Sequence, residues 1–197
     1  MAEALRLQRF TMVDLSPHFN NKGLTLPENR EEGDLRGLGD SLPAEDLPPA
    51  GVFENCGVPF LMPDARWPRD NLELEGQELP LPRGRWARAH FLGTSDLASF
   101  EAEVAVVYAG GPPEPKRLGF SAFNSVAAPV YGERPGPTAR RLRTRYKDTP
   151  MDLRLWHQTL ELDASRELLA LRFEDLPVLH VFAITLEGPG EDGGEGP

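Results

Sequence analysis

The chain has 197 residues, a single cysteine and a formal net charge of −10. This length suits one large domain with a buried core, and the lone Cys56 excludes an intramolecular disulfide framework. The negative charge disfavours partners that need a basic surface, so we expect no nucleic-acid and no membrane partner. Twenty prolines and nineteen glycines are typical of short strands joined by turns rather than of long helices.

The N-terminal stretch "MAEALRLQRFTMV" lacks the continuous apolar segment of a secretory signal. No apolar run approaches the roughly 20 residues that a membrane-spanning helix needs. We therefore expect a cytoplasmic protein.

The first half of the chain alternates short strand signals with turns. Residues 13–26, "VDLSPHFNNKGLTL", begin like a strand and break at Asn20–Gly23, which we interpret as a structural corner in preference to a ligand contact. Asn and Gly tolerate positive φ in such a corner. Residues 28–50 are acidic and are expected to form a long loop, which is functional or mobile. Residues 51–63 predict a hairpin around Asn55-Cys56-Gly57.

The second half carries the clearest strands. In residues 100–108, "FEAEVAVVY", apolar side chains alternate with Glu101 and Glu103, which predicts a half-buried strand. Residues 179–187, "LHVFAITLE", are apolar on both faces and are expected to lie centrally in a sheet. Further strands are predicted at 72–82, 85–93, 116–123, 140–146, 152–163 and 166–173.

This spacing predicts an all-β fold, a two-sheet antiparallel β-sandwich of the jelly-roll type. Residues 1–187 would form one domain, followed by a disordered acidic tail at 188–197. The predicted core contains Phe100, Val104, Val106, Leu155, Leu169, Leu171, Phe182 and Ile184.

The motif "GDSL" at 39–42 resembles the nucleophile block of the GDSL hydrolases. Such a serine needs a histidine base that a carboxylate orients. The late pair Asp175 and His180 has the wrong spacing, so we interpret the match as chance and expect no catalytic residue.

The four histidines, His18, His90, His157 and His180, stand singly in the sequence. No His-x-His or HExxH pattern occurs, and we predict no metal ligand and no cofactor. A structural calcium ion stays an open alternative, because carboxylates are abundant in residues 34–46.

The three tryptophans are the candidate ligand-binding residues. An exposed indole can stack on the apolar face of a sugar ring, while neighbouring polar groups bind its hydroxyls. Trp67 lies in the polar loop "DARWPRDN" with Arg69, Asp70 and Asn71. Trp86 and Trp156 lie in predicted strands, where core packing is the preferred interpretation, and are held as further candidates.

Arg141, Arg143 and Arg145 alternate along one predicted strand. They could bind an anionic ligand. We prefer a solvated strand face that pairs with Glu101 and Glu103 of another strand.

Several blocks in order resemble a known family: "VDLSPHFNNKGLT", "GDSLPAEDLP", "GVPFLMP", "DNLELEGQELPLP", "HFLG" and "LHVFAITLE". They are similar to an accessory β-sandwich module found beside bacterial glycoside hydrolases and some secreted peptidases. The resemblance covers about residues 10–187. It implies a galactose-binding-type sandwich and carbohydrate binding, and it makes Ser41 part of a structural block.

Three functional hypotheses follow. The first is a non-catalytic carbohydrate-binding protein that uses Trp67, Arg69, Asp70 and Asn71, with Trp86 or Trp156 in reserve. The second is a structural or interaction protein without sugar binding, for which a homodimer is an open alternative. The third is a hydrolase that uses the segment 28–50.

Overall fold

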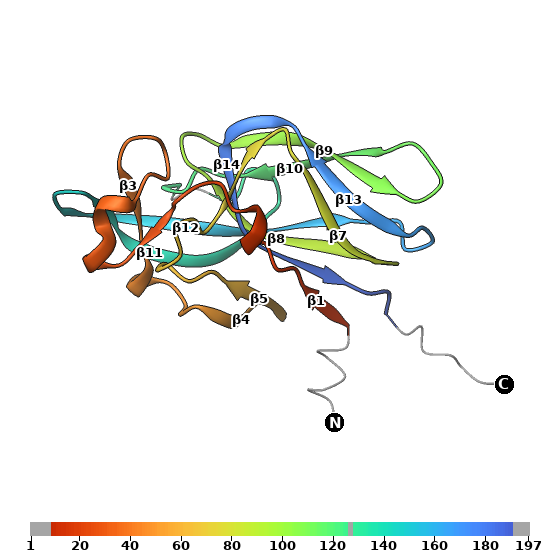
Figure 1. Cartoon of the computed structure of the whole chain (residues 1–197), viewed down its shortest axis with the longest axis horizontal. Coiled ribbons are helices and arrows are strands. Elements are labelled where there is room, and N and C mark those ends of the chain that lie inside the picture. The colour runs from red at the N-terminus through yellow and green to blue at the C-terminus, as the bar shows by residue number, and fades with distance from the viewer. Residues whose placement is uncertain (1–8, 126–127, 191–197) are drawn as a thin grey trace, which may run out of the picture.

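The computed structural model describes residues 9–125 and 128–190. These residues form strands joined by turns, as Figure 1 shows, together with three short 3₁₀ helices. The strands are β1 (Phe10–Met12), β2 (Leu24–Thr25), β3 (Asp40–Pro43), β4 (Gly51–Asn55), β5 (Val58–Met62), β6 (Leu72–Glu75), β7 (Glu78–Gly84), β8 (Arg88–Ser95), β9 (Phe100–Tyr108), β10 (Glu114–Phe120), β11 (Arg134–Thr144), β12 (Asp148–Glu161), β13 (Leu168–Phe173) and β14 (Asp175–Glu187). The 3₁₀ helices are η1 (Ser16–His18), η2 (Pro27–Glu32) and η3 (Ala44–Asp46).

The strands pair into three sheets. The largest has eight strands in the order β1-β14-β8-β12-β11-β3-β2, with β6 also pairing with β14. A four-stranded sheet has the order β10-β9-β13-β7, and β4 and β5 form a separate hairpin. The pairs are antiparallel except for β2 and β3, which run parallel. The predicted all-β sandwich is therefore confirmed.

Two hydrophobic cores lie on opposite faces of the large sheet. One core packs Phe91 and Ile184 of that sheet against Val104 and Leu171 of the four-stranded sheet. The other packs Leu155 and Phe182 against the β4–β5 hairpin and the N-terminal segments. The central strands β8, β12 and β14 are apolar on both faces because both faces are covered.

Most of the predicted core is buried, with two differences. Phe100 is only partly buried and packs against the margin of the first core. Leu169 is also only partly buried, since the register of β13 shifts between Leu168 and Ala170 and turns Leu169 away from the core. Such a bulge re-aims one side chain in a way that a period-two pattern does not predict.

Two segments differ from their sequence-based expectations. Residues 28–50 contain most of η2, all of β3 and η3, so this segment is not one continuous loop. The β4–β5 hairpin turns at Cys56-Gly57 as predicted, with φ of 53° and 79°, and it adds a third layer beyond the two expected sheets (Figure 1). The predicted tail falls mainly on residues 191–197, outside the described part.

The edges of the four-stranded sheet are rich in proline. Edge strand β7 contains Pro80 and Pro82, and edge strand β10 contains Pro115 followed by Lys116 and Arg117. Proline cannot donate a ladder hydrogen bond, and charged side chains discourage an incoming strand. In the ranges that the model describes, no helix is long and apolar enough to cross a membrane.

Candidate functional site

The loop between β5 and β6 carries four of the predicted ligand-binding residues. Trp67 is 40% exposed, and its ring lies 6.5 Å from the ring of Phe19. The loop is braced locally, because Asp64 accepts hydrogen bonds from the backbone N–H groups of Arg66 and Trp67 at 2.9 Å. Arg69 is exposed and donates to the carbonyl of Asn20 at 2.6 Å. Trp67 and Arg69 are thus accessible at the surface.

Asp70 and Asn71 point inward instead. Asp70 is fully buried, lies 3.0 Å from the ammonium group of Lys22 and accepts the backbone N–H of Gly23 at 2.7 Å. Burial raises the pKa of Asp70, and the neighbouring charge of Lys22 opposes that rise. Asn71 is fully buried and donates to the side-chain oxygen of Asn21 at 2.9 Å. A ligand at the surface therefore cannot reach either side chain.

Lys22 is the residue that sequence reasoning missed. Its Nζ atom lies 2.7 Å from the carbonyl oxygens of both Ala65 and Trp67, in addition to Asp70. An ammonium group has three N–H donors, and all three are used here. The corner at Asn20–Gly23 thus anchors the Trp67 loop from below, in agreement with the preferred structural interpretation.

Space, and not positive φ, explains the glycine in this corner. Residues 20–23 have no positive φ; among the described non-glycine residues only Cys56 has one. Gly23 is required for space, because a Cβ atom there would lie 2.7 Å from Asn71 Nδ2 and 2.9 Å from Leu35 Cδ1.

The two other tryptophans belong to the packing. Trp156 is fully buried and donates its N–H to the carbonyl of Ala122 at 3.3 Å, so a surface ligand cannot stack on it. Trp86 is partly buried, donates to the carbonyl of Pro82 at 3.0 Å and lies over Gly84. These contacts match the packing interpretation that was preferred for both.

The serine of the "GDSL" motif and Arg143, the middle residue of the arginine stripe, are also held in internal contacts. Ser41 is fully buried, and its hydroxyl lies 2.6 Å from that of Thr25. Arg143 is 1% exposed and contacts Glu45 and Asp148 rather than the expected Glu101. The hydrogen bond from Arg143 holds the pKa of Asp148 below its usual value.

Two of the scattered histidines meet beneath the β4–β5 hairpin. His90 Nδ1 lies 3.1 Å from His157 Nε2, and His90 Nε2 lies 2.9 Å from a carboxylate oxygen of Glu187. Phe60 covers the His157 ring edge-on at 5.0 Å. Burial lowers the pKa of His90, and burial together with Arg134 lowers that of His157 to about 3. His90 and His157 are both buried, and through Phe60 they lie against the second core.

A metal site would need at least three ligand side chains close together, which can be checked in residues 9–125 and 128–190. Within these ranges no three His, Cys, Asp or Glu side chains are placed to hold a metal ion. The calcium alternative therefore has no such cluster in its favour in this part of the chain.

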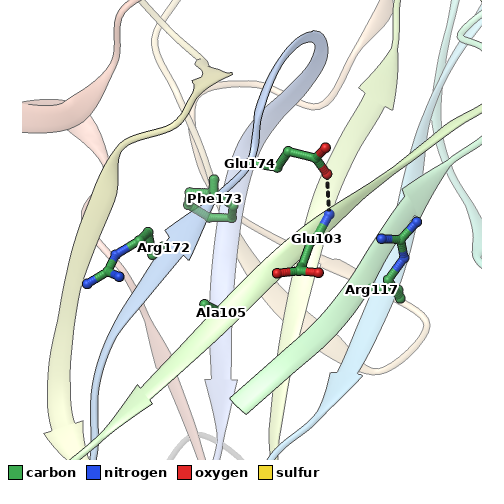
Figure 2. A pocket seen from close by; sticks show the side chains of 6 residues that line it. All are labelled: Glu103, Ala105, Arg117, Arg172, Phe173 and Glu174. Carbon is green, nitrogen blue, oxygen red and sulfur yellow. Dashed lines mark hydrogen bonds between the residues drawn. The ribbon is translucent and has the colours of Figure 1, made fainter. Parts of the chain in front are cut away.

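A hollow of about 310 Å³ lies on the outer face of the four-stranded sheet. Figure 2 shows Arg172 and Arg117 on opposite sides of Glu103, above the small side chain of Ala105. The backbone N–H of Glu103 donates to the carboxylate of Glu174 at 2.7 Å. Each guanidinium already pairs with a carboxylate: Arg172 with Glu78 at 2.8 Å and Arg117 with Glu101 at 2.9 Å. We interpret this face as a solvated ladder of ion pairs.

A second hollow, of about 350 Å³, lies between residues 44–50 and 62–66. Leu24, Leu47 and Met62 line it, and Glu45 and Arg66 also contribute. It opens beside the loop that carries Trp67.

The most exposed apolar side chains of the large sheet lie at one end of it. Tyr146 is 90% exposed in the turn between β11 and β12, and Leu38 is 73% exposed in the turn before β3. The two turns are neighbours, because β3 pairs with β11 and the side chain of Arg145 lies over Gly39. We call Leu38, Arg145, Tyr146 and Lys147 the end surface; the turn between β11 and β12 lies at the left of Figure 1.

A family model described as the AziU2-like beta-sandwich domain matches residues 9–189. The match spans all the strands and confirms the predicted β-sandwich. A comparison with curated proteins finds no match. The predicted association with carbohydrate binding and glycoside hydrolases stays a prediction.

Proposed function

We propose that this chain, which belongs to the AziU2-like beta-sandwich domain family, is a non-catalytic interaction domain that acts by binding another protein through its end surface. The observation that carries the proposal is the pair of exposed side chains Tyr146 and Leu38 on adjacent turns. Tyrosine and arginine are enriched where proteins bind each other.

Hydrogen bonds close both turns, which supports a binding role. Thr144 receives the backbone N–H of Lys147 on its hydroxyl at 3.2 Å, and its own N–H donates to the carbonyl of Lys147 at 2.9 Å. The turn at Leu38 is closed by Asp34, which accepts the N–H of Gly39 at 2.7 Å. A turn backbone that is already held in this way loses little conformational entropy on binding.

The proline-rich strand edges support the same choice of surface. Pro80, Pro82 and Pro115 weaken strand-to-strand pairing at both edges of the four-stranded sheet. Association through exposed side chains at the end of the molecule does not meet this obstacle.

Site-specific photo-crosslinking in the native cell tests the proposal. A photoreactive phenylalanine replaces Tyr146 in one variant and Val52, which is 62% exposed on β4, in the control. We expect a discrete crosslinked protein at position 146 and none at position 52. Absence of a product at 146, or the same products at both positions, would refute the proposal.

Carbohydrate binding is the second candidate, and the exposure of Trp67 between Arg66 and Arg69 favours it. A glycan array followed by calorimetry tests it with Trp67→Ala and, as the control, Trp86→Ala. Binding at millimolar sugar that Trp67→Ala alone weakens at least tenfold would support this candidate. Background signal throughout would remove it.

A further inference from the structure

We propose that the partner at the end surface is a second copy of this chain, bound in a two-fold symmetric pair in which Tyr146 of each copy packs against Leu38 of the other. This inference rests on the proposed function, since it uses the same surface and names the partner. The argument comes from the charges that flank the two exposed apolar side chains.

The end surface carries basic side chains, and the segment that leads to Leu38 carries acidic ones. Arg145 and Lys147 are exposed on one turn, while Glu31, Glu32 and Asp34 are exposed on the segment that leads to Leu38. The two groups are held together structurally, because Arg30 of η2 lies 3.3 Å from Asp148, which directly follows the basic turn. Three acidic groups therefore stand next to two basic groups around an apolar centre.

This arrangement discriminates between classes of partner. A uniformly acidic protein surface would be repelled by Glu31 and Glu32, and a uniformly basic one by Arg145 and Lys147. In a two-fold pair each surface meets its own reversed copy. The basic turn of one copy can then face the acidic segment of the other, on both sides of the symmetry axis.

The overall charge of the chain points to the same region. Two copies with a net charge of −10 each repel one another over most of their surface. The end surface and its flanks are nearly balanced in charge, so two copies can approach there with the least repulsion. Apolar contact between Tyr146 and Leu38 would then supply attraction at the centre of the contact.

Sedimentation velocity of the full chain, from about 1 μM to about 1 mM, tests the pair without any unidentified partner. We expect the mass to rise with concentration from 21.8 kDa to twice that value. Tyr146→Ala should raise the dissociation constant at least tenfold. Leu97→Ala, at a 66% exposed residue outside the end surface, is the matched control and should leave it unchanged.

Charge-reversal variants test the contact between the basic turn of one copy and the acidic segment of the other. A variant with Arg145→Glu and Lys147→Glu should be monomeric, as should a variant with Glu31→Lys and Glu32→Lys. An equimolar mixture of the two should pair again, because each reversed surface complements the other. Circular dichroism confirms that each variant is folded.

The inference is overturned by a monomer at all concentrations, by a dimer that Tyr146→Ala does not weaken, or by a mixture that stays monomeric. A monomer whose position 146 crosslinks a different protein in the cell would overturn the second-copy inference and leave the proposed interaction function standing. A crosslink product made of two copies of this chain would support both.

Discussion

Lowering the pH from 7 to 5 is expected to destabilise the fold through His157, which lies buried against His90 and Phe60. The unfolded chain binds a proton at this histidine near its ordinary pKa of 6.5, whereas the folded chain binds one only near pH 3. The free energy of unfolding therefore falls as the pH drops below about 6.5, by roughly 1.4 kcal/mol per pH unit. The loss at pH 5 is about 2 kcal/mol.

Two further effects bear on the size of the loss and on the pH window. Burial also lowers the pKa of His90, which adds to the loss in the same direction. The pKa values of the carboxyl groups of Glu45, Asp148 and Glu187 are lowered below ordinary values of 4.5, 3.8 and 4.5. Their contributions to stability therefore decline mainly below pH 5, outside the window in which the histidines act.

Urea unfolding at pH 7, 6 and 5, followed by tryptophan fluorescence, measures the effect. His157→Gln removes the titrating ring, so the variant should show a shallower decline in unfolding free energy than the wild type, whatever its stability at pH 7. Constant or rising stability between pH 7 and pH 5, or an equal slope in the variant, would refute the reasoning.

Three further outcomes follow from the Trp67 loop and the end surface. Gly23→Ala should destabilise the fold by about 1–3 kcal/mol in a thermal melt, because its Cβ would lie 2.7 Å from Asn71 Nδ2; an unchanged melting temperature would contradict this. Lys22→Met leaves Asp70 buried without its cation and should cost about 3–5 kcal/mol in urea unfolding, part of which Asp70→Asn restores in the double variant; equal losses in the single and double variants would show that the pair is not coupled. Tyr146→Ala should change the unfolding free energy of the monomer at low concentration by less than about 0.5 kcal/mol, since the side chain is 90% exposed; a larger loss would mean that Tyr146 supports the fold.

The strands could be predicted where their periodicity is local. Residues 100–108 form β9 with the predicted bounds, because alternation of apolar and charged side chains depends only on neighbouring positions. Strand β3 could not be found in this way. Its sequence "DSLP" is short and polar, and it becomes a strand by pairing with β2 and β11, contacts that the local pattern does not contain.

The candidate site shows the same limit. Asp70 and Asn71 follow an exposed tryptophan in a polar loop, which predicted a ligand contact. Their actual partners are Lys22, which precedes Asp70 by 48 positions, and His180, whose Nδ1 lies 2.9 Å from the side-chain oxygen of Asn71. Sequence can say that a buried carboxylate needs a cation, but it cannot say which carboxylate is buried.

Strand β14 has apolar side chains on both faces, and this leaves a problem of alignment that hydrophobicity cannot solve. If β14 shifted by one residue relative to β8, its apolar side chains would move from one face of the sheet to the other and would still be buried in a core. In the shifted register, however, three buried polar side chains of β14 would lose their partners: His180, Thr185 and Glu187. Thr185 donates to the carbonyl of Pro59 at 2.6 Å, and Glu187 lies beside His90. We therefore infer that these buried polar contacts select the observed register of β14 over shifted registers with equally apolar packing.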